Sequence, residues 1–133
     1  MSFRRFSLAA GVALIGAACG VSGPSGNTVE TFSGTLQVGG SNTHSGYTVS
    51  KNGEVEVTMT SVTPTPFGGP IAMGLGQVLS GGCQPLGQAY LTTAIVNKKA
   101  SFGLLNKGTY CLVVFDPGVL IAPLSYAGNF SHP

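Results

Sequence analysis

The sequence predicts an all-β fold, an antiparallel β-sandwich of about seven or eight strands with one disulfide. Apolar and polar residues alternate with a period of two in short stretches, and 21 glycines and 8 prolines divide the 133 residues at intervals typical of turns. Beyond residue 18, no window has the apolar stripe of an amphipathic helix. We expect a signal peptide at 1–18, a tether at 19–27 and one β-sandwich domain at 28–133.

The first 18 residues have the composition of an export signal. Arg4 and Arg5 precede an apolar run that ends in small residues and is too short to span a membrane. The residues leading to Cys19 resemble a bacterial lipobox, in which the cysteine is lipidated and attaches the protein to a membrane. Ordinary cleavage near Ala18 is the alternative. We therefore expect an outer-membrane, periplasmic or cell-surface lipoprotein, or otherwise a secreted protein.

Charge excludes several classes of partner. Both arginines lie in the signal, so residues 19–133 contain four lysines and four carboxylates and carry no net charge. Nucleic-acid binding depends on clustered Lys and Arg, so no nucleic-acid partner is expected. The 43% apolar content excludes a disordered tail. Segment 19–27 is rich in Gly, Ser and Pro, which is typical of a flexible tether.

The first strands are predicted from alternation. Residues 28–38 are expected to form the opening strand, with Phe32, Leu36 and Val38 facing inward. The clearest strand covers 54–61, where Val55, Val57 and Met59 share one face. The dipeptide Asn52-Gly53 just before it is a strong hairpin signal, so 45–50 is expected to pair with 54–61 through a tight turn.

The rest of the chain alternates between turns and strands. Three prolines and two glycines make 63–70 a loop. Strands are expected at 71–79, 91–96, 100–105, 109–115 and 125–132. Gly74 and Gly76 indicate that another backbone approaches closely.

Two cysteines are expected to form a structural disulfide. Cys83 and Cys111 are separated by 28 residues in a chain with an export signal, and extracellular cysteines of this kind pair. The chain-entropy model gives such a bridge about 3.5 kcal/mol of stabilisation. A redox or zinc role would need a CxxC motif or a His/Cys cluster, and the sequence contains neither.

An ordered set of motifs in the second half carries a family resemblance. It consists of Gly74-Leu-Gly76, Gly82-Cys83, the stretch Lys107-Gly-Thr-Tyr-Cys111 to Asp116, Tyr126 and His132-Pro133. The set resembles a group of small exported bacterial proteins that is similar in turn to the pre-peptidase C-terminal (PPC) domain. The resemblance covers residues 28–133 and implies a β-sandwich accessory module of the kind found beside secreted peptidases. Some relatives bind calcium through acidic loops, but only one carboxylate, Asp116, lies in an expected loop here, so we expect no metal.

The sequence contains no catalytic constellation. His44 lies in an expected polar loop and His132 is the penultimate residue, so both are expected to be solvated. No nucleophile elbow accompanies either one. Glu54 and Glu56 share the expected solvent face of a hairpin, where they are interpreted as solubilising charges that prevent strand addition. We therefore predict no enzyme and no cofactor.

Binding is the remaining class of function. Phe67, Tyr47 and Tyr90 are candidate ligand contacts because amphipathic rings suit sugars, whereas Tyr110 and Tyr126 are expected in the core. The sequence thus predicts a non-catalytic exported binding or accessory module of the cell envelope or extracellular space. Its partner would be a glycan or an envelope protein, together with a membrane if Cys19 is acylated. The alternatives are a self-associating surface or matrix component and a carbohydrate-binding module.

Overall fold

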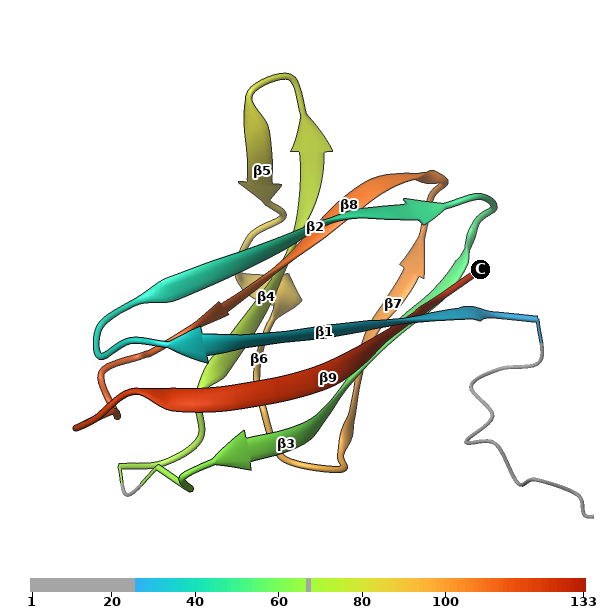
Figure 1. Cartoon of the computed structure of the whole chain (residues 1–133). Helices are drawn as coiled ribbons and strands as arrows, with labels where there is room; N and C mark the ends of the chain where they lie inside the picture. The colour runs from blue at the N-terminus through green and yellow to red at the C-terminus, as the bar shows by residue number, and fades with distance from the viewer. Residues whose placement is uncertain (1–25, 67) are drawn as a thin grey trace, which may run out of the picture.

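The computed structural model describes residues 26–66 and 68–133, in which nine strands form two antiparallel sheets (Figure 1). The first sheet has the order β1 (Thr28–Leu36), β9 (Leu124–His132), β3 (Gly53–Thr63) and β7 (Lys99–Leu105). The second has the order β2 (Ser41–Val49), β8 (Gly108–Phe115), β4 (Ala72–Leu79) and β5 (Gly82–Pro85), and β6 (Leu91–Thr93) also pairs with β4. The predicted antiparallel β-sandwich is confirmed.

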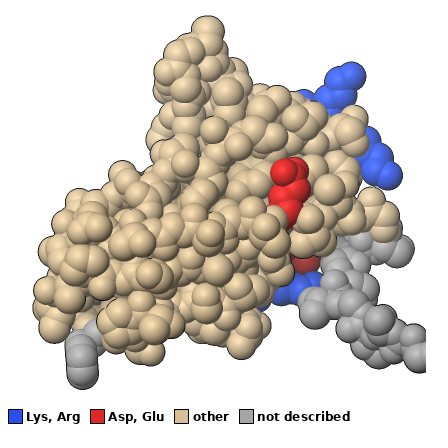
Figure 2. Space-filling model, viewed as in Figure 1, with Lys and Arg blue, Asp and Glu red and all other residues tan. Residues whose placement is uncertain are grey.

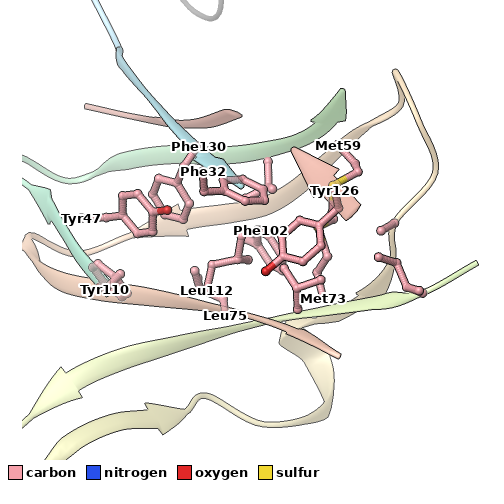
Figure 3. Packing of buried hydrophobic residues seen from close by; sticks show 14 of the residues in the cluster. Phe32, Tyr47, Met59, Met73, Leu75, Phe102, Tyr110, Leu112, Tyr126 and Phe130 are labelled. Carbon is pink, nitrogen blue, oxygen red and sulfur yellow. The ribbon is translucent and has the colours of Figure 1, made fainter. Parts of the chain in front are cut away.

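The core lies between the two sheets. Val55, Val57 and Met59 on β3 are fully buried, as their alternation predicts. Tyr47 of β2 stacks on Phe130 of β9 with ring centroids 4.0 Å apart, so an aromatic contact joins the sheets. Figure 3 shows these rings among other buried side chains from both sheets.

The final strand is central in its sheet. It pairs with β1 on one side and with β3 on the other, and Phe32 lies opposite Gly128. A Cβ at Gly128 would contact the Phe32 ring and would lie 2.7 Å from the Thr58 carbonyl oxygen. The glycine therefore leaves the space that the Phe32 ring fills.

The predicted pairing of 45–50 with 54–61 is wrong. Strand β2 pairs with β8, and β3 pairs with β7 and β9 in the opposite sheet. Neither Asn52 nor Gly53 takes a positive φ, so the two-residue hairpin turn does not form. The chain instead passes from one sheet to the other at this point. Strand β3 is consequently a central strand and not part of an edge hairpin.

Several strand bounds differ from the prediction, and one strand was not expected. Strand β2 begins at Ser41, four residues before the predicted start at 45, and β3 extends to Thr63, two residues beyond the predicted end. Strand β1 ends at Leu36, and Val38 is 53% exposed in the following turn rather than facing inward. Strand β6 ends at Thr93, so Ile95 and Val96 belong to the connection to β7. The short strand β5 was not expected, because the residues of Gly82–Pro85 have little β-propensity. In the structure this strand pairs with β4 alone, as the second strand of a hairpin. The 3-10 turn η1 (Gln88–Tyr90) lies between β5 and β6.

The disulfide between Cys83 and Cys111 is present. It joins β5 to β8 within the second sheet and crosses β4 at Gly76, so it does not connect one sheet to the other. A Cβ at Gly76 would lie 2.7 and 2.8 Å from the two sulfur atoms. The close approach expected there is therefore made by the disulfide and by the Gln84 carbonyl oxygen. Such a bridge indicates a location outside the cytoplasm.

The N-terminal predictions lie outside the described residues. These are the signal at 1–18, lipidation of Cys19 and most of the tether at 19–27. Among residues 26–66 and 68–133, no helix is long and apolar enough to cross a membrane.

Candidate functional site

An apolar groove lies at one end of the sandwich, where several loops meet. It has a volume of about 550 Å³ and is lined by Val62 and by segments 65–66, 69–71 and 94–96. A smaller hollow beside it is lined by segments 64–66 and 120–122 together with Leu124. We call the first the loop-end groove, and the groove together with segments 64 and 120–122 the loop-end surface. Its lining is aliphatic or proline except for Thr65, Gly69 and the backbone.

The Asp116 carboxylate organises the loops of this end. Its Oδ1 accepts hydrogen bonds from the backbone N–H groups of Gly118, Val119 and Leu120, at 2.8, 2.7 and 3.2 Å. Its Oδ2 accepts one from Gly39 at 2.8 Å, which ties the turn after β1 to the turn after β8. The hydrogen bond from Gly39 is the largest cause, ahead of the other three, that holds the pKa of Asp116 below its ordinary value. The predicted turn at 116–118 is thus confirmed, and this carboxylate serves the backbone.

The loop before β4 packs on the same structure. A Cβ at Gly68 would lie 2.6 Å from the Val119 carbonyl oxygen, so the backbone at Gly68 is in close contact with the 117–123 connection. The loop-end surface is therefore built on segments that hold one another.

Charge is concentrated away from the loop-end surface. On the face that Figure 2 shows, the charged side chains lie toward the opposite end of the molecule. Of the residues that line the groove or lie within two sequence positions of one that does, only Lys98 is charged. The groove thus favours an apolar ligand over a charged one.

The structure separates the predicted ligand contacts. Tyr47 is only 5% exposed, so its ring belongs to the core and the expected surface contact there is wrong. Burial, with a smaller contribution from Glu30, raises the pKa of Tyr47 to about 12. Tyr90 is half-buried at the end of η1 and packs against the core. Phe67 lies outside the described residues, and Tyr110 and Tyr126 are buried as predicted.

His44 takes part in a polar network that the sequence did not reveal. It lies on β2 and is half-buried, which corrects its expected place in a solvated loop. Burial lowers the pKa of His44, because it disfavours the charged ring. The Tyr126 hydroxyl lies 2.7 Å from His44 Nε2 and accepts a hydrogen bond from Asn42 Nδ2 at 3.0 Å, and Asn42 Nδ2 also donates to the Thr35 carbonyl oxygen. The network therefore joins β2 to β1 through Thr35 and to β9 through Tyr126. The sequence carried no signal for it, because both faces of β2 are polar around Asn42 and His44.

His132 is also buried, contrary to the expectation that it is solvated. It is 4% exposed, and its Nε2 lies 2.7 Å from Glu30 Oε1 on the neighbouring strand β1. The two histidines therefore belong to separate contacts, one with Tyr126 and one with Glu30.

The paired glutamates of β3 have neighbours on β7. Glu54 accepts a hydrogen bond from the Ser101 hydroxyl at 2.7 Å, and Glu56 forms an ion pair with Lys99 at 3.1 Å. Because β3 is central, these side chains cross-link two strands and do not protect an edge. Among the described residues, no three His, Cys, Asp or Glu side chains gather in a group that could hold a metal ion.

Comparison with known proteins extends the description of the fold. No family model and no curated protein matches the chain, so the resemblance to the PPC domain depends on the motifs alone. Among solved structures, the chain is similar to the crystal structure of Yersinia pseudotuberculosis-derived mitogen (YPM), with a TM-score of 0.53 and 14% sequence identity. The alignment covers 80% of this chain and 86% of that one. At this identity the likeness concerns the fold alone.

Proposed function

We propose that the chain is a non-catalytic binding module of the cell envelope or the extracellular space, and that it binds an apolar ligand in the loop-end groove. The groove is the observation that carries this proposal. Its volume of about 550 Å³ lies within the range of small-molecule sites, and its walls are aliphatic side chains and proline rings. His44, His132 and Asp116 do not line the groove, and their side chains form hydrogen bonds with Tyr126, with Glu30 and with the backbone of the 117–123 connection.

Several observations support export and an accessory role. The Cys83–Cys111 bridge is typical of oxidising compartments. The pattern of residues 1–18 and the lipobox-like approach to Cys19 agree with it, and lipidation of Cys19 is part of the proposal. The PPC-like motifs favour a module that accompanies other envelope or secreted proteins.

A titration with the fluorescent probe N-phenyl-1-naphthylamine tests the groove. The probe is apolar and uncharged, so its emission should rise when it enters the groove. Val96→Asp places a carboxylate on the lining, and the cost of desolvating it should weaken probe binding by roughly tenfold or more.

Leu104→Asp is the matched control, because Leu104 is 84% exposed on β7 and does not line the groove. It should bind the probe as the unmodified chain does. Equal binding by both variants, or no binding by the unmodified chain, would contradict the proposed function.

Self-association is the second candidate, and one observation favours it. Strand β7 is an edge strand that pairs only with β3, and it carries the most exposed aliphatic side chain of the described residues, Leu104. Light scattering at rising protein concentration should then show oligomers that Leu104→Asp removes; a monomer throughout contradicts this candidate. A glycan ligand has less support, because every aromatic ring that the structure describes is buried or half-buried.

A further inference from the structure

We infer that the loop-end surface docks on the surface of a lipid bilayer, and that its exposed aliphatic side chains enter the boundary between headgroups and acyl chains. This inference rests on the proposed function, because it names the partner that the same surface would contact. Four properties of the surface support it: its exposure, its charge, its rigidity and its size.

The aliphatic side chains of this surface project into solvent. Ile121 is 80% exposed in the connection between β8 and β9, and Ile95 and Val96 are exposed at the rim of the groove. An aliphatic side chain in this position gains free energy when it leaves water. A bilayer interface accepts such side chains from the tips of loops without a matching cavity.

The charge pattern favours lipid over a charged partner. Segments 64–66, 69–71, 94–96 and 120–122 contain no ionisable side chain. Asp116 is close in sequence, but four backbone N–H groups surround its carboxylate. The described lysines and carboxylates balance at four each, and Lys98 is the one lysine within two positions of the groove residues, so attraction to anionic headgroups has little part in docking. Binding should therefore depend on apolar insertion and change little with salt.

The surface is held in shape before it meets a partner. The Asp116 hydrogen bonds fix the start of the 117–123 connection, and Gly68 packs against Val119. Docking thus needs little ordering of the loops, which lowers its entropic cost.

The size of the patch favours a bilayer over a second copy of the chain. A stable protein interface buries about 20–30 residues on each side, whereas this surface presents only a few exposed aliphatic side chains. Interfacial insertion succeeds with a few side chains, because lipid surrounds each one individually.

The chain contains no tryptophan, so a single introduced one reports on its own surroundings. Ile121→Trp places the reporter on the loop-end surface, and Leu104→Trp places it at a matched exposure on β7, since these positions are 80% and 84% exposed. Both variants are made in the exported chain with Cys19→Ser, so that no lipid attached there takes part. The probe is a vesicle of phosphatidylcholine, and circular dichroism confirms that each variant keeps its strand content.

We expect the emission of Ile121→Trp to move to shorter wavelength with vesicles and that of Leu104→Trp to stay unchanged. In the otherwise unmodified chain, Ile121→Asp should weaken vesicle binding by roughly tenfold, which corresponds to the lost burial of one isoleucine side chain. Vesicles with added phosphatidylglycerol should bind equally well at low and high salt.

Three results would overturn the inference: no shift at position 121, an equal shift at both positions, or a shift at 121 that appears without vesicles as protein concentration rises. The last result would assign the surface to a second copy of the chain. If the naphthylamine probe still binds when the tryptophan does not shift, the proposed function stands and only lipid docking is wrong. If the probe also fails to bind, both are wrong.

Discussion

The substitution Gly76→Ala tests whether the disulfide passes directly over β4. The bridge crosses β4 there, and a Cβ would lie 2.7 Å from Cys83 Sγ, 2.8 Å from Cys111 Sγ and 2.8 Å from the Gln84 carbonyl oxygen. All three atoms belong to groups with little freedom, because β5 and β8 pair with β4 on its two sides. Gly76→Ala therefore cannot be accommodated by the rotation of a flexible side chain.

We expect Gly76→Ala to lower the free energy of unfolding by about 2 kcal/mol, as overpacking does in other well-packed sites. The same substitution in a chain with Cys83→Ala and Cys111→Ala should cost less than about 1 kcal/mol, because both sulfurs are gone and β5 is free to move. Urea unfolding of the four proteins, followed by circular dichroism, gives the two differences directly.

The double substitution of the cysteines alone should cost about 3.5 kcal/mol, from the 28-residue separation. An equal cost of Gly76→Ala with and without the sulfurs would contradict this explanation. That result would mean that the glycine is needed for the β4 backbone and not for the bridge above it.

Two predictions concern pH. Burial favours the neutral phenol of Tyr47 and raises its pKa to about 12, so its contribution to stability is complete below the ordinary value near 10 and is lost as pH rises through 12. Spectrophotometric titration should show this tyrosine ionising last and Tyr47→Phe removing that step; a titration near 10 would contradict it. The pKa of Asp116 is lowered, so its contribution is present above the ordinary carboxyl value and is lost as pH falls through the folded value. Asp116→Ala should lower Tm at neutral pH, and the further fall of Tm as the pH is lowered should be smaller than in the unmodified chain. An equal fall of Tm at low pH would show that this carboxylate does not hold the loops.

The sequence was most informative where one face of a strand is buried. Val55, Val57 and Met59 alternate with polar residues, and all three are buried because successive side chains of a strand point to opposite faces. Tyr126 on β9 was likewise expected in the core and is buried. The same logic failed at His44, because an inward row of Asn42 and His44 has no apolar alternation to detect.

The candidate site could not be found in this way. The groove brings together segments 65–66, 69–71 and 94–96, which are distant in sequence and belong mostly to connections. Ile95 and Val96 extend the apolar pattern of β6, and alternation alone places them in the strand. The strand ends at Thr93 because the chain then crosses to the other sheet, with the Asn97 N–H bonded to the Met59 carbonyl oxygen of β3. That Ile95 and Val96 line a surface is therefore visible only in the path of the connection from β6 to β7.

The Asn52-Gly53 pair shows why a local signal can mislead. Glycine is required where φ is positive or where another group comes too close for a Cβ, and a sequence does not distinguish the two reasons. At Gly53 the second reason applies, since a Cβ would meet the Pro133 ring. The Asn52 side chain is likewise engaged elsewhere, where its Oδ1 accepts a hydrogen bond from the Lys107 N–H at 2.8 Å. Both residues thus fix contacts with distant parts of the chain, and those contacts allow β2 and β3 to lie in different sheets.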